Sequence, residues 1–80
     1  MEQLVATGQL RIKFGLRLSY LRKKANLKQI ELAAALGVSK KTISRMERGH
    51  QGTSFDNLEI ITQVLGVKEW QLFKFDDDEM

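Results

Sequence analysis

The chain has 80 residues, no cysteine and one histidine, and its formal net charge is +3. This composition excludes disulfides and thiolate metal sites, and the length allows one small domain with a marginal hydrophobic core. No apolar run approaches the ~20 residues that cross a bilayer, and the first residues lack the apolar segment of a secretory signal. We therefore expect a cytoplasmic protein with no metal, no cofactor, no small-molecule ligand and no membrane contact.

The positive charge is concentrated in one part of the chain. Residues 11–48 carry eleven Lys or Arg and only two acids, a balance of +9, whereas residues 76–79 are all acidic. Clustered positive charge is typical of a protein that binds a polyanion. On charge alone, the alternative is a basic surface that only keeps the protein soluble.

Residues 1–9 show no sustained periodicity, which predicts a flexible N-terminal arm. Residues 10–25 place apolar side chains at helical spacing, so we expect a first helix whose core stripe is Leu10, Phe14, Leu18 and Leu21. The other faces of this helix are basic, with Arg11, Arg17, Lys23 and Lys24. Gly15 costs about 1 kcal/mol relative to alanine inside a helix, which a close contact with another helix would justify.

The next stretch, residues 29–48, reads QIELAAALGVSKKTISRMER. Its apolar residues recur every three or four positions as far as Leu36, which predicts a second helix. Gly37 can adopt the left-handed conformation that ends a helix, and Ser39 is a good N-cap for a new one. The stretch therefore predicts a helix, a tight glycine turn and a third helix over residues 39–48.

Residues matching a known motif follow at fixed offsets along this stretch, namely Gln29, Leu32, Ala33, Gly37, Val38, Ser39, Ile43 and the triplet Glu47-Arg48-Gly49. Together they resemble the helix-turn-helix of the lambda-repressor-like family, which includes Cro, phage repressors and Xre-type regulators. The resemblance extends over roughly residues 10–73. It implies an all-α, compact five-helix domain, here residues 10–75, with the helix-turn-helix at helices two and three.

The remaining elements complete this expectation. Relatives usually carry Ser, Thr or Asn where Lys28 stands, so the second helix is expected to start without a side-chain cap. Thr53 and Asp56 fit a capping box, with Ser54 as the competing cap. The fourth helix, over residues 55–65, is expected to turn inward Leu58, Ile61, Val64 and Leu65. A short fifth helix should end at Phe73, and an acidic tail, residues 76–80, is expected to be disordered.

A helix-turn-helix reads double-stranded DNA by placing its second helix in the major groove, which is ~12 Å wide. Lys and Arg near the start of that helix can donate to guanine O6 and N7. We therefore predict guanine-containing half-sites read by Lys41 and Arg45, with Lys40 on a base or an adjacent phosphate. The further DNA-binding candidates are Lys28, Gln29, Thr42, Ser44 and Arg48. The alternative is a solvated basic helix face.

Glu47 is an acid within this basic segment. The resemblance implies a structural ion pair between Glu47 and Arg22 of the first helix, which would lock the third helix against the first.

A role in dimer formation is predicted for the C-terminal aromatic residues Trp70, Phe73 and Phe75, because they offer more area than one short helix can bury. We expect them to form a homodimer interface, with closure of the monomer core as the alternative.

These features predict a sequence-specific, double-stranded DNA-binding transcription regulator that reads a palindromic operator as a dimer. A Cro-like repressor, a restriction-modification controller and a DNA-binding antitoxin are all compatible with the sequence. The alternative from another class is a protein-interaction module on the same fold, although the basic third helix argues against it. An enzyme is not expected, because no catalytic constellation is visible.

Overall fold

The computed structural model describes residues 3–75, and over these residues the chain forms four α-helices and a final 3-10 helix. The elements are α1 (Gln9–Lys24), α2 (Gln29–Leu36), α3 (Lys40–Glu47), α4 (Phe55–Leu65) and η1 (Glu69–Phe73). The expected all-α class is confirmed, with one correction: the fifth helix is a five-residue 3-10 helix. The acidic tail, residues 76–80, lies outside the described residues.

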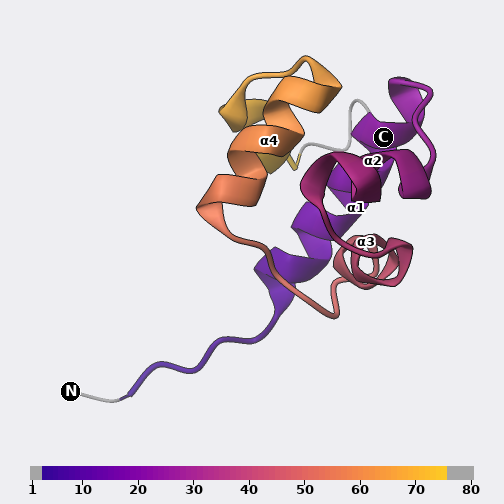
Figure 1. Cartoon of the computed structure of the whole chain (residues 1–80). Helices are drawn as coiled ribbons and strands as arrows, with labels where there is room; N and C mark the ends of the chain where they lie inside the picture. The colour runs from indigo at the N-terminus through magenta and orange to yellow at the C-terminus, as the bar shows by residue number, and fades with distance from the viewer. Residues whose placement is uncertain (1–2, 76–80) are drawn as a thin grey trace.

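Helix α1 packs against α3 and η1, whereas α2 packs against both α3 and α4. Figure 1 shows this arrangement, with α4 to the left of α2 and α3. Residues 3–7 have no regular secondary structure and lead away from the helices (Figure 1). The pair α2 and α3 is thus supported by α1, which packs on α3, and by α4, which packs on α2, while η1 packs on both α1 and α4.

The core contains apolar side chains from all five elements, namely Phe14, Leu18, Leu21, Leu32, Ala33, Leu36, Ile43, Met46, Ile61, Leu65 and Leu72. Two expected core residues are wrong. Leu10 is 61% exposed, because it lies in the first turn of α1 and faces a surface groove instead of the core. Val64 is also exposed, and Thr62 is buried on α4 in its place, where its hydroxyl donates to the carbonyl of Glu59 at 2.6 Å.

The helix ends follow the local sequence with one exception. Ser39 caps α3 and Ser54 caps α4, each accepting a backbone N–H through its side chain. The capping box expected at Thr53 is therefore wrong, and the Thr53 hydroxyl is buried with no hydrogen-bond partner among the described residues. Lys28 gives α2 no side-chain cap. Instead, the Glu31 carboxylate accepts the Lys28 backbone N–H at 2.8 Å, which satisfies one orphan donor.

Helices α1 and α3 approach each other closely at Gly15. A Cβ atom at this position would lie 2.4 Å from the Met46 carbonyl oxygen and 2.7 Å from that of Glu47. Both oxygens belong to the backbone and cannot move aside without shifting α3. The absence of a side chain at Gly15 therefore allows α3 to lie this close to α1.

We predict that Gly15→Ala destabilises the domain by about 1–3 kcal/mol, because the overpacking cost exceeds the ~1 kcal/mol gained in helix propensity. For a domain of this size, each kcal/mol lowers the melting temperature by roughly 4–8 °C. Thermal unfolding followed by circular dichroism measures the change. Gly52→Ala is the matched control, since a Cβ there meets nothing within 4 Å. Equal melting of Gly15→Ala and the wild type would contradict the close approach.

Candidate nucleic-acid interface

Helix α3 has two chemically distinct faces. Its buried face consists of Ile43, Met46 and Glu47. Lys41, Arg45 and Arg48 follow one another at spacings of four and three residues, so they form one stripe on the opposite side of the helix. Lys41 and Arg48 are exposed, and Arg45 is half-buried. The side of α3 that faces away from the core is therefore basic along its whole length.

Hydrogen bonds hold the two arginines of this stripe against nearby groups. The Arg45 Nε donates to the Gln51 side-chain oxygen at 3.2 Å, and the Arg48 Nε donates to the Ser44 carbonyl at 3.3 Å. Gln51 belongs to the loop after α3 and is half-buried. These contacts use only the Nε atom of each guanidinium. Because a guanidinium has five N–H donors in a fixed fork, donors remain on each for an anion or a base edge.

The first turn of α3 combines a fixed cap with two exposed lysines. Ser39 accepts the Thr42 backbone N–H at 3.1 Å, and the two hydroxyls lie 3.1 Å apart. Thr42 is half-buried and shares its hydroxyl with this cap. Lys40 and Lys41 are both exposed at the helix start, where the backbone N–H groups also favour negative charge. The cap thus fixes the end of α3 that the sequence predicts to meet base edges.

The Glu47 carboxylate is the junction of the three N-terminal helices. Arg22 donates to it from Nε at 2.6 Å and from Nη2 at 3.0 Å, and Gln29 donates from its amide nitrogen at 2.9 Å. Arg22 also donates from Nη1 to the Leu27 carbonyl at 2.7 Å. This network satisfies both oxygens of a buried acid. One of the two amide hydrogens of Gln29 is thereby engaged, and the other remains available for the predicted DNA contact.

Two arginines counted in the basic segment do not belong to its surface. Arg17 and Arg22 are 1% and 7% exposed. Arg17 donates from Nε to the Gln71 carbonyl of η1 at 2.7 Å, and its guanidinium lies 5.4 Å from the centre of the Tyr20 ring. The expectation that Arg17 lies on an outer face is therefore wrong. The sequence does contain a signal that Arg17 is buried. Arg17 lies three residues after Phe14, so on a helix it is a neighbour of the apolar stripe that includes Phe14 and Leu18.

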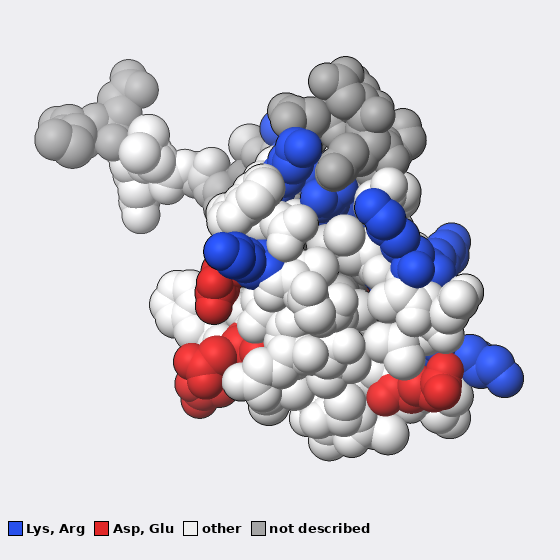
Figure 2. Space-filling model, turned by 90° about the horizontal axis from the view of Figure 1, so that it is seen from above, with Lys and Arg blue, Asp and Glu red and all other residues white. Residues whose placement is uncertain are grey.

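The other basic residues are exposed or half-buried, so the surface keeps its charge asymmetry. Figure 2 views the molecule from above, relative to Figure 1, and shows this separation on one face. Most Lys and Arg side chains there lie in the upper half, and most Asp and Glu side chains lie in the lower half. Opposite charges are thus segregated on this face instead of alternating.

The predicted dimer residues lie together at the C-terminal end of the described chain. Trp70 is 60% exposed and Phe73 is 42% exposed. The Phe73 ring lies 5.5 Å from that of Phe14 and 6.2 Å from that of Phe75, which is half-buried. Phe73 therefore serves partly to close the core, whereas Trp70 presents most of its surface to solvent.

Residues 3–75 contain neither of two other features that would indicate a different kind of protein. No helix in this part of the chain has both the length and the hydrophobicity needed to span a membrane. Within the same residues, no three His, Asp or Glu side chains converge as metal ligands.

Sequence comparison with known proteins gives consistent results. The profile of a family described as helix-turn-helix matches residues 18–69. The control protein C.BamHI of Bacillus amyloliquefaciens is 36% identical over 70 residues, which cover 86% of each chain. An uncharacterised HTH-type transcriptional regulator of Methanocaldococcus jannaschii is 40% identical over 63 residues, covering 79% of this chain and 96% of that protein.

Solved structures show the same similarity. The restriction-modification controller protein C.AhdI of Aeromonas hydrophila superposes with a TM-score of 0.73 at 32% identity, covering 79% of this chain and 96% of that one. The clp gene regulator ClgR of Corynebacterium glutamicum superposes with a TM-score of 0.76 at 30% identity, covering 80% of this chain and 68% of that one. The resemblance stated from the sequence is thereby confirmed.

We predict that Glu47→Ala lowers the free energy of unfolding by about 3–5 kcal/mol, because it leaves the buried Arg22 guanidinium without its counter-charge. Calorimetry measures this loss. DNA affinity, measured at a temperature where the variant is still folded, should be unchanged. Glu59→Ala removes an exposed carboxylate from α4 and is the control. A melting temperature equal to that of the wild type would contradict the structural role assigned to Glu47.

Proposed function

Since the chain belongs to the helix-turn-helix family, whose members are DNA-binding transcription regulators, we propose that it reads a palindromic operator as a dimer, with α3 in the major groove. The observation that carries the proposal is the basic stripe of Lys41, Arg45 and Arg48, opposite the buried face of α3. We place the DNA-binding domain at residues 10–75, with an N-terminal arm before it, and we propose a cytoplasmic location.

The base contacts are assigned to Lys41 and Arg45. In a helix-turn-helix, residues near the N-terminus of the inserted helix reach the base edges. Arg45 can donate two parallel bonds to guanine O6 and N7, and Lys41 can donate to the same acceptors. Lys40 precedes this pair and lies at the edge of the stripe, where a base and the adjacent phosphate are both within reach of a long side chain. The proposed operator half-site therefore contains guanine.

The phosphate contacts are assigned to Arg48, at the end of the stripe, and to Lys28, Gln29 and Thr42 beside it. Ser44 can contact a base edge or a phosphate. Lys28 and Gln29 stand at the start of α2, where backbone N–H groups also favour an anion. Contacts of this kind position the protein on the duplex without carrying sequence information. These contacts release counterions, so the affinity they provide depends on salt. A protein that makes six to ten of them would lose ~10³–10⁵ in affinity when the salt concentration rises from 50 to 200 mM.

The biological context is proposed from the relatives. Among the similar proteins, C.BamHI is named as a control protein and C.AhdI as a restriction-modification controller protein. We therefore favour a role in controlling restriction-modification genes over the other contexts that the sequence allows. No catalytic activity is part of this proposal.

We predict that the double variant Lys41→Ala/Arg45→Ala no longer prefers guanine at the half-site, at about 1–3 kcal/mol for each base contact that is removed. Selection of bound oligonucleotides from a random pool, followed by titration of the selected and scrambled duplexes, measures this preference. The charge-matched control is Lys23→Ala/Lys68→Ala, which changes exposed lysines outside α3. If either control lysine binds a phosphate, the control weakens binding to all duplexes equally. Intact discrimination in the folded α3 variant would overturn the base assignments.

The dimer is proposed from the exposed aromatic surface at the C-terminal end. Aromatic side chains are enriched at interface hot spots, and Trp70 and Phe73 both present large exposed areas. Two-fold symmetry would place two copies of α3 one helical turn apart, about 34 Å, on the same side of the DNA. The half-buried Phe75 would extend this surface.

We predict that the wild-type chain sediments as a dimer at micromolar concentration and that Trp70→Ser raises the dissociation constant about thirtyfold, the effect of losing one hot-spot residue worth ~2 kcal/mol. Analytical ultracentrifugation without DNA measures both. Ile30→Ser is the matched control, because Ile30 is an equally exposed apolar residue, 60%, on α2. A strictly monomeric wild type at high micromolar concentration would remove the dimer.

A further inference from the structure

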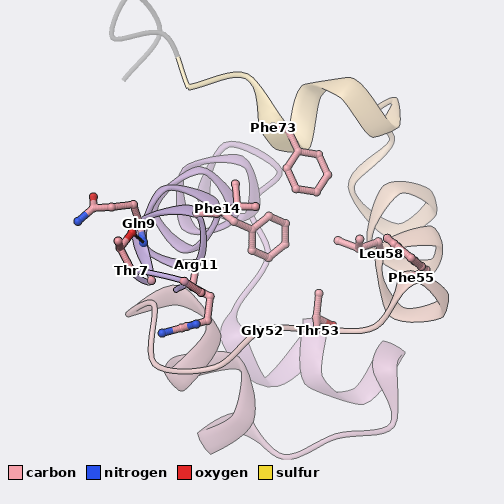
Figure 3. A pocket seen from close by; sticks show the side chains of 12 residues that line it. Thr7, Gln9, Arg11, Phe14, Gly52, Thr53, Phe55, Leu58 and Phe73 are labelled. Carbon is pink, nitrogen blue, oxygen red and sulfur yellow. Dashed lines mark hydrogen bonds between the residues drawn. The ribbon is translucent and has the colours of Figure 1, made fainter. Parts of the chain in front are cut away.

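An apolar groove lies between the start of α1 and the C-terminal elements. It has a volume of about 410 Å³. In Figure 3, the side chains of Phe14, Leu58 and Phe73 point toward a common space from α1, α4 and η1. Phe55 and Leu10 also line it and are 88% and 61% exposed. A concave surface with this much exposed apolar area is unfavourable in water and is typical of a binding site.

The same chain carries an exposed aliphatic segment of matching chemistry. Leu4 and Val5, in the N-terminal arm, are 94% and 83% exposed. Side chains of this kind gain free energy when they are buried. The arm leaves the helical body in an extended course, as Figure 1 shows. The molecule thus presents an apolar groove and an apolar peptide, both without a covering partner among the described residues.

The arm does not fill the groove of its own chain, because its base forms one wall of that groove. Residues 6–9 line the groove. They are held in place by two hydrogen bonds, from the Gln9 N–H to the Thr7 hydroxyl at 3.4 Å and from the Ile12 N–H to the Gly8 carbonyl at 3.1 Å. Leu4 and Val5 therefore continue outward from the wall.

We propose that the groove receives Leu4 and Val5 from a second copy of the chain, so that two copies exchange their N-terminal arms. This inference rests on the proposed dimer. Phe73 belongs both to the groove and to the exposed aromatic surface assigned to that dimer. The groove therefore opens at the edge of the dimer surface. In a two-fold dimer, each arm meets the other copy's groove, so one exchange implies two.

The reach of the arm limits the geometry of this exchange. Residues 3–8 are six residues and span at most about 20 Å when fully extended. Exchange therefore requires the two copies of α1 to approach each other near their N-terminal ends. The arm thereby adds apolar contacts beside the aromatic surface without involving α3.

The first test changes the arm of the full chain. Leu4→Ser/Val5→Ser should raise the dimer dissociation constant on the order of 100-fold, because two aliphatic side chains lose their burial. Gln3→Ser is the control and should leave the constant unchanged. Circular dichroism should show equal melting of the dissociated chains, since both sites are exposed in the monomer. An unchanged dissociation constant in the double variant would overturn the exchange.

The second test detects contact between the arm and the groove directly. The wild-type chain has no cysteine, so two single-cysteine chains of different mass can be mixed and oxidised. One carries Val5→Cys, and the other carries Gly52→Cys, which lines the groove and has open space for a side chain. A mixed disulfide is expected. Its absence, or an internal disulfide in the Val5→Cys/Gly52→Cys double variant at monomer mass, would overturn the second copy as the occupant.

The outcomes separate this inference from the proposed function. If the wild type is a dimer that binds its operator, and the arm variants dimerise equally well, arm exchange is overturned and the proposed function stands. If the wild type is a monomer at high micromolar concentration, both the dimer and the exchange are overturned. The base contacts proposed for α3 do not depend on this outcome, because the variant Lys41→Ala/Arg45→Ala tests them separately.

Discussion

The buried carboxylate of Glu47 is the constraint on which the DNA-binding half of the molecule depends. It lies on α3, accepts two hydrogen bonds from Arg22 of α1 and accepts a third from Gln29 of α2. A buried acid is costly unless it is paired and hydrogen-bonded, so these three helices are fixed relative to one another by the need to satisfy one side chain.

Helix α1 transmits this constraint through the rest of the fold. At Gly15 its backbone comes so close to α3 that no side chain fits between them. Two residues later, the buried Arg17 donates to the carbonyl of Gln71 and so holds η1. One helix thus fixes both the DNA-binding element and the aromatic end of the molecule. A rigid relation between these two ends is what a dimer needs to keep two copies of α3 in register with two half-sites.

The sequence is sufficient for the features that depend on local chemistry. Helical spacing, Gly37 and Ser39 locate the helix-turn-helix, because periodicity and caps act within a few residues. Local chemistry still leaves the choice between Thr53 and Ser54 as the cap of α4 open, and Ser54 is the cap. The other wrong predictions that matter for the site concern tertiary contacts. Arg17 is buried instead of exposed because its acceptor lies 54 residues away, and Leu10 faces a groove instead of the core. Of the candidate site, the stripe on α3 can be predicted, but the hydrogen bond from Arg45 to Gln51 depends on the loop path.

The division of α3 into two faces has a consequence for how such a protein can change over time. The residues that hold α3 in the fold, Ile43, Met46 and Glu47, are separate from the basic residues Lys41, Arg45 and Arg48 on its outer face. Substitutions on the exposed face leave the core packing untouched, and surface changes of that kind usually alter stability by little. A lineage of such regulators is therefore free to acquire new target sequences by drift on one side of a single helix, while the scaffold that displays it is inherited unchanged.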